Sequence, residues 1–262
     1  MQEGIFIAAS AGIKQSKKLE VIANNLANVN TTGYKRDRLA FKELMPPFPP
    51  DSGLEGGKNL LLSPDKSNKN VSYVAITDQY TDHKSGELKQ TNSPFDLGIN
   101  GEGFFSVETR DGIRYTRNGN FRLDTANRIV NQKGETLLNE QNEPIVINAQ
   151  GGDISIDRQG NIFTGNGQGN NVVGKIKLVK FKENKSLEKI GDGQYKQKDP
   201  KNIEIPSNAT IQQGFLEDSN VSTVEEMTTM MATLRVFETY QKVIQSIDSM
   251  DDQAVNNIGR VG

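Results

Sequence analysis

Several residue types are absent or scarce in this 262-residue chain. The chain has no cysteine, which excludes a disulfide framework, a thiol nucleophile and a thiolate zinc site. A single histidine, His83, excludes a histidine-rich metal site within one chain. The 31 Lys and Arg residues nearly balance the 33 Asp and Glu residues, so the strong positive field needed to coat nucleic acid or an anionic membrane is missing. We therefore expect no metal or other cofactor and no nucleic-acid partner.

Long apolar runs are missing too. No run approaches the roughly 20 residues that cross a bilayer, so we expect no direct membrane span. Residues 1–12 lack a basic start and contain only a short apolar run, so we expect no cleavable secretory signal. Apolar residues make up 34% of the chain and its mean hydropathy is −0.61, which predicts a modest core.

The distribution of proline and glycine divides the chain into three parts. All nine prolines lie within residues 46–206, and residues 215–258 contain neither proline nor glycine. Both residue types break helices, so their absence predicts one long C-terminal helix. Residues 1–30 contain no proline and few glycines, which predicts a second helix. The fold class is therefore α+β, with the two terminal helices paired like a coiled coil into one discontinuous domain around a β-rich centre.

The predicted domain boundaries follow this division. The Pro-rich start and polar remainder of residues 45–70 predict a long exposed loop. The predicted segments are residues 1–34 as the N-terminal helix of an assembly domain, 35–72 as a linker or extended loop, 73–214 as the β-rich central domain and 215–262 as the C-terminal helix.

The long C-terminal helix has a start signal and an apolar line. Ser222 with Glu225, or Thr223 with Glu226, has the spacing of a capping box. Apolar residues then recur at a mean spacing of about 3.4, near the 3.5 of a coiled-coil seam, and the N-terminal stretch has a similar line. The predicted C-terminal seam consists of Val224, Met227, Met231, Leu234, Phe237, Tyr240, Ile244, Ile247, Met250, Ala254 and Ile258. Burying the C-terminal seam yields roughly 15–30 kcal/mol, and ordering the backbone costs at least as much, so the helix needs a partner. We infer that the two helices pack together and that oligomerisation completes the pair; a two-helix extension lying on its own β domain is the alternative.

Turn-forming pairs between short β-type runs predict hairpins in the centre. Asp111-Gly112 lies between two alternating runs, and residues 157–160 lie between two more. Residues 175–181 alternate strictly, as in a half-buried strand. The aromatic residues that we place in the β core are Phe95, Phe104, Phe105, Tyr115 and Phe121.

Catalytic chemistry has little support in the sequence. His83 lies in a polar run before Gly86, which is typical of a solvated loop histidine. Residues 165–169 are Gly-rich but lack the Lys-Ser/Thr of a phosphate-binding loop. The acidic residues are dispersed along the chain, so only the folded structure could bring two carboxylates together as in a glycosidase. We therefore expect no enzymatic activity.

The N-terminal segment carries a family resemblance. Residues 19–35, with Ala-Asn-Asn-Leu-Ala-Asn followed by Thr-x-Gly-Tyr-Lys, resemble the N-terminal signature of the bacterial flagellar rod and hook proteins. Asn127 departs from the family pattern, which usually has Gly there, but asparagine tolerates a left-handed turn better than most residues. Three further blocks resemble motifs of the same family, namely residues 93–107, 115–121 and 213–221.

Two further segments bear on the branch within this family. Residues 173–180 and 235–248 resemble the proximal rod (FlgF-like) branch more than the distal rod (FlgG-like) branch, which is the second candidate.

The resemblance implies a structural subunit of the rod in the flagellar basal body, spanning the periplasm. Subunits of this kind are exported unfolded through the flagellar type III apparatus, and their ends become helical on assembly. The helices then form the inner wall of a hollow, torque-transmitting shaft, and the expected partners are homologous rod subunits, adjacent rod or hook axial proteins and, in transit, the export apparatus. The residues expected on the assembly interface are Leu19, Ile22, Asn24, Asn25, Leu26, Asn28, Val29, Met227, Met231, Leu234, Phe237, Ile244 and Ile247.

Two functions from other classes stay open at this point. One is an extracytoplasmic enzyme that acts on the cell wall and uses the helices as an anchor; it requires two acidic residues set close together in a cleft. The other is a surface-displayed binding or adhesion module, for which the terminal helices would be dispensable.

Overall fold

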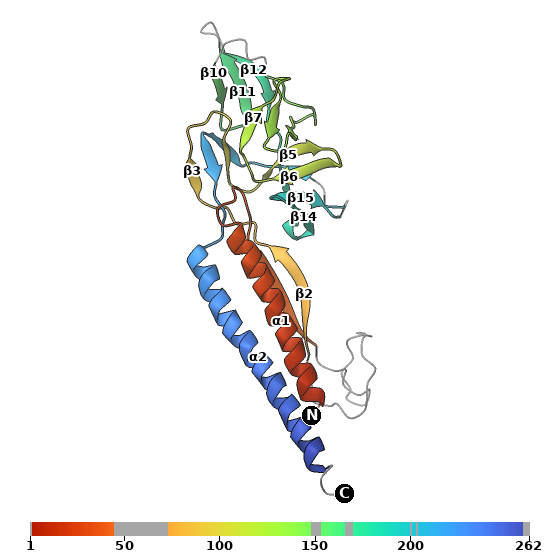
Figure 1. Ribbon diagram of the computed structural model, residues 1–262. Coiled ribbons are helices and arrows are strands. Elements are labelled where there is room, and N and C mark those ends of the chain that lie inside the picture. The colour runs from red at the N-terminus through yellow and green to blue at the C-terminus, as the bar shows by residue number, and fades with distance from the viewer. Residues whose placement is uncertain are drawn as a thin grey trace. The chain divides into compact units, whose positions relative to one another are not determined.

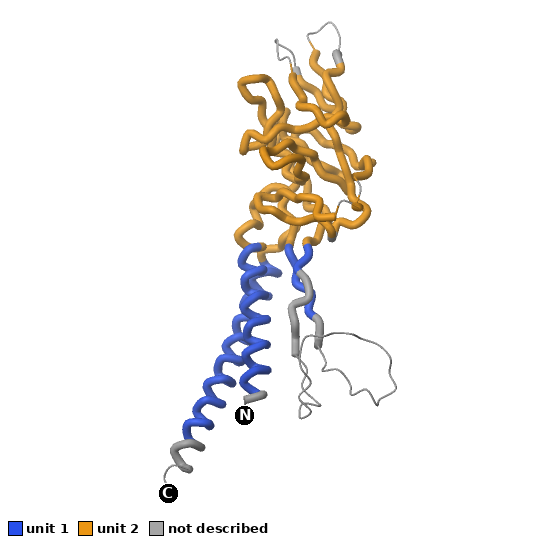
Figure 2. Tube along the Cα trace, turned by 90° about the vertical axis from the view of Figure 1, so that its right-hand side faces the viewer, with its two compact units in different colours: residues 1–24, 37–80, 224–262 blue, residues 25–36, 81–223 orange. Residues whose placement is uncertain are grey.

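The computed structural model describes residues 2–44, 73–147, 153–165, 170–199, 201–202 and 204–258. The chain divides into two compact units, coloured separately in Figure 2. Unit 1 comprises residues 1–24, 37–80 and 224–262, and unit 2 comprises residues 25–36 and 81–223. The predicted loop over residues 45–70 lies outside the described residues.

Two helices bound the chain, as predicted. Helix α1 spans Gln2–Ala27 and helix α2 spans Thr223–Ile258 (Figure 1). Ser222 immediately precedes α2, and Glu225 and Glu226 lie in its first turn, where acidic side chains favour the positive end of the helix dipole. The predicted order of helix, β-rich centre and helix, and with it the α+β class, is confirmed.

Unit 1 adds a two-stranded sheet to the helices. Strand β1 (Asp37–Leu44) pairs with strand β2 (Tyr73–Thr81), so part of the stretch expected as a linker forms a strand. The ammonium of Lys14 on α1 lies 4.4 Å from the ring centroid of Phe41 on β1. This cation–π contact joins α1 to the sheet of unit 1.

Unit 2 is built from short antiparallel strands. A large sheet carries the order β14-β15-β6-β5-β9-β8-β7, with β13 joining β5 to β16, and smaller sheets pair β10-β11-β12, β17-β4 and β18-β3 (Figure 1). The strands are β3 (Leu88–Gln90), β4 (Leu97–Asn100), β5 (Phe104–Thr109), β6 (Gly112–Thr116), β7 (Phe121–Leu123), β8 (Ile129–Asn131), β9 (Thr136–Leu137), β10 (Asp153–Ile156), β11 (Asn161–Gly165), β12 (Asn170–Lys175), β13 (Leu178–Phe181), β14 (Leu187–Gly191), β15 (Gln194–Gln197), β16 (Glu204–Pro206), β17 (Thr210–Gln213) and β18 (Phe215–Glu217).

Both predicted hairpins are present, and one predicted strand is divided. β5 and β6 pair across a two-residue turn at Arg110-Asp111, after which Gly112 begins β6, and β10 and β11 pair across residues 157–160. The run over residues 175–181 is split at Ile176, which is buried in the core and bridges to Asn139, because the chain there changes its pairing from β11 to β5.

Two groups of buried side chains form the core of unit 2. The larger contains Phe105 and Phe121, with Phe95 packed against it, and the smaller contains Phe104 and Tyr115. The predicted aromatic core is therefore confirmed.

One turn design recurs four times in unit 2. An Asp or Asn at the first position accepts hydrogen bonds through its side chain from the backbone N–H groups two and four residues later, at 2.8 to 3.0 Å. The fourth residue of each turn has a positive φ between 59° and 87°, which asparagine and glycine tolerate best. Asn127, with φ of 59°, thus occupies the left-handed position expected for it. The first and fourth residues are Asp124 and Asn127, Asn131 and Gly134, Asn139 and Asn142, and Asp157 and Gly160.

Candidate assembly interface

One line of side chains on helix α2 is buried or half-buried. The line begins with buried Glu226 and Thr233 and continues with half-buried side chains to Ile247. A Cβ on Gly4 of α1 would lie 3.5 Å from Cδ1 of Ile247, so the two helices approach closely, and they run in opposite directions in Figure 1. The whole line, with alternating steps of four and three residues, is Glu226, Met230, Thr233, Phe237, Tyr240, Ile244, Ile247 and Asp251.

A second line on α2 is apolar and exposed. It occupies only the first three turns of the helix, which follow the start at Thr223. The side chains of Val224, Met227, Met231 and Leu234 are 77%, 49%, 57% and 41% exposed. We call these four residues the leading patch.

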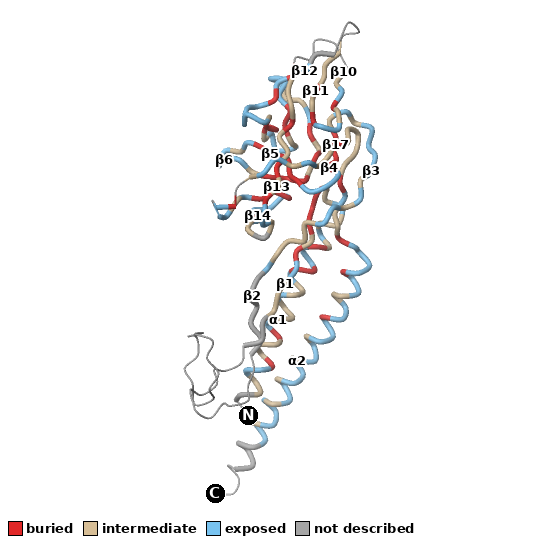
Figure 3. Tube along the Cα trace, turned by 180° about the vertical axis from the view of Figure 1, so that it is seen from behind, coloured by how far each residue is buried: buried red, intermediate tan, exposed pale blue. Residues whose placement is uncertain are grey.

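A third line on α2 is exposed and uncharged. Figure 3 shows that exposed residues run along most of this helix. Val236, Val243 and Met250, seven residues apart, are the large side chains of this line. The line, which we call the uncharged stripe, consists of Ala232, Val236, Thr239, Val243, Ser246, Met250 and Gln253.

The exposed face of α1 is apolar only in its first half. Phe6 and Ile13, also seven residues apart, are 66% and 67% exposed, and Ile7 is 40% exposed. Further along, the exposed positions carry Lys17 and Glu20. We call Phe6, Ile7 and Ile13 the α1 patch.

The structure distributes the predicted interface residues over several environments. Ile22 and Asn25 are buried, and Asn24, Met227, Met231 and Leu234 are exposed. The remaining residues are half-buried, namely Leu19, Leu26, Asn28, Val29, Phe237, Ile244 and Ile247.

The predicted seam of α2 does not stay on one face. From Met231 it advances through Leu234 and Phe237 to Tyr240 in three steps of three residues. Nine residues at about 100° each turn the line by roughly half a turn, so Met231 and Tyr240 lie on opposite sides of the helix. The first part of the predicted seam is therefore the exposed leading patch, and the second part joins the packed line.

Within unit 2, the family motifs meet around one buried carboxylate. Oε1 of Glu217 accepts hydrogen bonds from Nζ of Lys35 at 2.5 Å and from the backbone N–H of Gly86 at 2.8 Å. Oε2 lies 3.2 Å from Nη1 of Arg117. The three charged side chains are at most 2% exposed. We call Lys35, Arg117 and Glu217 the charge cluster; it links segments next to each helix with the middle of the chain.

Backbone groups complete the charge cluster. Lys35 also donates to the carbonyl of Lys84 and Arg117 to that of Gly101, both at 2.8 Å. Burial lowers the pKa of Lys35, and the adjacent carboxylate of Glu217 offsets part of that effect. Because two cations share one anion, removing the carboxylate would leave buried charge without compensation.

Asn220 ties the same segments together through its amide. Its Oδ1 accepts from the N–H of Arg36 at 2.8 Å, and its Nδ2 donates to the carbonyls of Asp82 and Lys84 at 2.8 and 3.0 Å. The backbone N–H of Gly33, which has a φ of 69°, donates to the carbonyl of Glu217 at 2.7 Å. The residues after α1 are thereby fixed to the residues before α2.

His83 packs beside the charge cluster, so the prediction of a solvated histidine is wrong. Its ring lies edge-on to Phe104 and Tyr195, with centroids 5.5 and 5.2 Å away, and its Nδ1 is buried without a hydrogen-bond partner. Burial lowers the pKa of His83 to about 4, and the cations of Lys35 and Arg117 act in the same direction. At neutral pH the ring is therefore uncharged.

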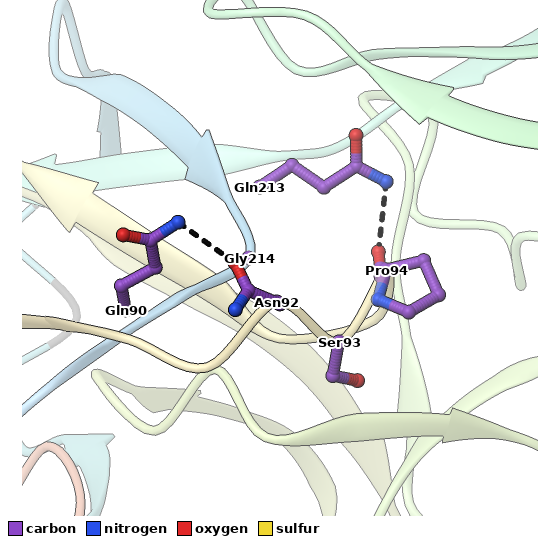
Figure 4. A pocket seen from close by; sticks show the side chains of 6 residues that line it. All are labelled: Gln90, Asn92, Ser93, Pro94, Gln213 and Gly214. Carbon is purple, nitrogen blue, oxygen red and sulfur yellow. Dashed lines mark hydrogen bonds between the residues drawn. The ribbon is translucent and has the colours of Figure 1, made fainter.

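The described residues offer little for catalysis. A shallow cavity of about 290 Å³ is lined by neutral groups (Figure 4), in which Nε2 of Gln213 donates to the carbonyl of Pro94 at 2.9 Å. No group of three or more acidic or histidine side chains that could hold a metal ion occurs in the part of the chain that the structure describes. Within the same residues, no helix is long and apolar enough to cross a membrane.

Three family models match separate parts of the chain. The model described as flagella basal body rod protein matches residues 5–35, which include most of α1. The model described as the flagellar hook protein FlgE/F/G D1 domain matches residues 98–164. The model described as the flagellar basal body rod FlgEFG protein C-terminal region matches residues 212–258, which include α2.

Curated relatives match over almost the full length. The flagellar basal-body rod protein FlgF of Mesorhizobium japonicum is 27% identical over 99% of each chain. FlgF of Caulobacter vibrioides is 30% identical over the whole of both chains. FlgG of Buchnera aphidicola from Acyrthosiphon pisum is 32% identical over 95% of this chain and 97% of the relative.

Proposed function

The chain belongs to the family of flagellar basal-body rod proteins of the FlgF and FlgG type, and we propose that it builds the rod through the exposed faces of its two terminal helices. As a member of this family it is a structural subunit of the bacterial flagellum that assembles with other rod or hook subunits, and an enzymatic role is not supported.

The observation that carries the proposal is the exposure of α2. A helix that rests on its own domain should expose polar residues on its remaining faces. On α2 the leading patch and the uncharged stripe are exposed instead, so two faces besides the packed line are suited to protein contacts. Neighbouring subunits in a tubular wall would cover both faces.

In this proposal α1 and α2 pair along the packed line in the manner of a coiled coil. The alternating steps of four and three residues on α2 favour such a pairing, and Gly4 on α1 permits the close approach to Ile247. The interface residues predicted from the sequence then have two roles. Those on the packed line, including Phe237, Ile244 and Ile247, hold the pair, and Met227, Met231 and Leu234 face a neighbouring subunit.

The charge cluster supports the transmission of torque in this proposal. It fixes the segment that contains Lys35 to the segment that contains Glu217, although these residues are 182 positions apart. A shaft that twists without yielding needs both chain segments next to the helices to move together. Buried charge-assisted hydrogen bonds hold such segments more rigidly than solvent-exposed pairs do.

We place the subunit in the proximal rod, because residues 173–180 and 235–248 resemble the FlgF-like branch. Relatives named FlgF and FlgG have similar identities to this chain, so the distal rod is the second candidate. Transit through the flagellar type III apparatus without a cleavable signal belongs to the same proposal. Complementation of strains that lack either rod protein distinguishes the two positions, since only one of the two strains should regain swimming.

A set of charge substitutions tests the assembly role. Met227→Asp, Met231→Asp and Leu234→Asp, made together, should abolish incorporation into isolated basal bodies and swimming, because burying each carboxylate in an apolar interface costs several kcal/mol. The matched control places the same three charges at exposed polar positions of α2 outside the leading patch, as Thr228→Asp, Gln245→Asp and Ser249→Asp.

Two measurements decide the outcome of this test. Circular dichroism should show that both triple variants retain the β signal of unit 2. If the variant of the leading patch is incorporated as efficiently as the control, the helical faces do not form the assembly interface and the proposal is wrong.

A further inference from the structure

Sulfur chemistry in this chain is confined to methionine. The chain has no cysteine and six methionines, of which Met1 and Met45 lie outside the described residues. The other four all lie on α2, namely Met227, Met230, Met231 and Met250. The thioether of methionine takes up one oxygen from a peroxide and becomes a sulfoxide. Among the residues that the structure describes, oxidation of sulfur therefore falls entirely on this helix.

Exposure divides these four methionines. Met227, Met231 and Met250 are 49%, 57% and 57% exposed. Met230 is half-buried on the packed line, between Glu226 and Thr233 of that line. An oxidant that arrives from solvent therefore reaches the three exposed methionines first, and Met230 serves as an internal reference.

Met227 and Met231 form a pair, and Met250 stands apart from them. The two lie four residues apart, so their side chains are neighbours on one face of the helix. The other two members of the leading patch are also apolar, so this line contains no side-chain hydrogen-bond donor. On the uncharged stripe, Met250 has Ser246 and Gln253 at the adjacent positions, and their hydroxyl and amide groups can donate to a sulfoxide.

A sulfoxide changes what the leading patch can bind. Its S=O group is polar and accepts hydrogen bonds, whereas the thioether is a soft apolar packing group. A buried acceptor without a donor weakens binding by about tenfold or more, and the leading patch supplies no donor from its own side chains. Two sulfoxides side by side therefore turn an apolar contact surface into a polar one.

We propose that Met227 and Met231 are a modification site, at which hydrogen peroxide converts the leading patch into a form that does not assemble. The sulfur atom attacks one oxygen of the peroxide and the O–O bond breaks. The sulfur is oxidised to S=O, and the second oxygen leaves as water with both hydrogens. A methionine sulfoxide reductase reverses the step, because two thiols become a disulfide and the sulfoxide oxygen leaves as water.

This inference rests on the proposed assembly function. In that function a neighbouring subunit covers Met227 and Met231 once the chain is in the rod, so the thioethers react only before incorporation. Oxidised chains should then accumulate among unincorporated subunits, and basal bodies should contain the pair in its reduced form.

Peroxide treatment of the purified full-length chain tests the chemistry. Aliquots are taken at a series of times after hydrogen peroxide is added, and sulfoxides are located by mass spectrometry of tryptic peptides. Met227, Met230 and Met231 lie in one such peptide, since no Lys or Arg occurs between Lys201 and Arg235. Met227 and Met231 should gain oxygen several-fold faster than Met230. Equal rates at Met230 and Met231 would overturn the assignment of the site to the exposed face.

Variants in cells test the consequence for assembly. A strain that lacks its own copy of this rod protein and its methionine sulfoxide reductases receives the natural chain, Met227→Leu with Met231→Leu, or the matched control Met230→Leu with Met250→Leu. Each chain is compared with itself, with and without sublethal hydrogen peroxide. Incorporation of the natural chain and of the control into basal bodies should fall several-fold with peroxide, whereas that of the first double variant should change little.

Two outcomes of the cellular experiment overturn the inference. One is an equal loss of incorporation in the natural chain and in Met227→Leu with Met231→Leu. The other uses the natural chain alone: sulfoxides at Met227 and Met231 that are as frequent in basal bodies as in unincorporated chains. Absence of the natural chain from basal bodies without any peroxide refutes the proposed function instead.

Discussion

Acidification tests how tightly His83 is held against the charge cluster. The ordinary pKa of histidine, 6.5, applies to the unfolded chain, and burial lowers the pKa of folded His83 to about 4. Between these values the unfolded chain binds one proton more than the folded chain. The free energy of unfolding therefore falls as the pH decreases, by about 1.4 kcal/mol for each pH unit and about 3 kcal/mol in total.

The physical cause is specific to the surroundings of the ring. A protonated His83 would be a third cation beside Lys35 and Arg117, with Lys189 also near, and the rings of Phe104 and Tyr195 could not hydrate it. Below about pH 4 the folded chain takes up the proton too, and this contribution stops growing. At neutral pH the penalty is absent.

Urea denaturation of the full-length chain at a series of pH values measures this effect. The matched control is His83→Gln, which keeps a polar group but cannot titrate, and which should lose most of the dependence between pH 6.5 and 4. Because the chain has a single histidine, the ring resonances in a proton NMR titration report its pKa without an assignment experiment. A measured pKa near 6.5, or an unchanged pH dependence in His83→Gln, would refute the reasoning.

Two further predictions concern stability. Glu217→Gln should lower the free energy of unfolding by about 3–5 kcal/mol, because Lys35 and Arg117 lose their buried counter-ion; a loss under 1 kcal/mol in urea denaturation would contradict the role of the charge cluster. Gly134→Ala should cost about 1 kcal/mol or more, since Gly134 has a φ of 83° and a Cβ there would meet nothing within 4 Å, so the loss is purely conformational. Gly174→Ala, in equally open space but without a positive φ, is its control and should be neutral or slightly stabilising; equal effects at both glycines in thermal denaturation would rule out the conformational explanation.

Local chemistry explains why much of the fold is predictable from the sequence. A stretch without glycine or proline over residues 215–258 has no residue that interrupts backbone hydrogen bonding, and α2 covers most of it. The positive φ of Gly112 after the β5–β6 turn and that of Asn127 depend on the conformational preferences of single residues. The recurring turn design of unit 2 follows the same logic. Its signal, an Asp or Asn followed three residues later by Gly or Asn, is present in the sequence at all four turns, although only the turn over residues 157–160 is predicted above as a hairpin.

The sequence alone determined that two helices enclose a β-rich centre and that the chain resembles rod proteins, because periodicity and motifs are local properties. Only the tertiary structure decided which face of α2 is packed, since Met231 and Tyr240 follow one apolar spacing yet lie half a turn apart. It alone brought Lys35 to Glu217 and enclosed His83 between aromatic rings. Such contacts depend on the packing of distant segments, and no period of 2 or 3.6 residues encodes a partner that lies 182 positions away.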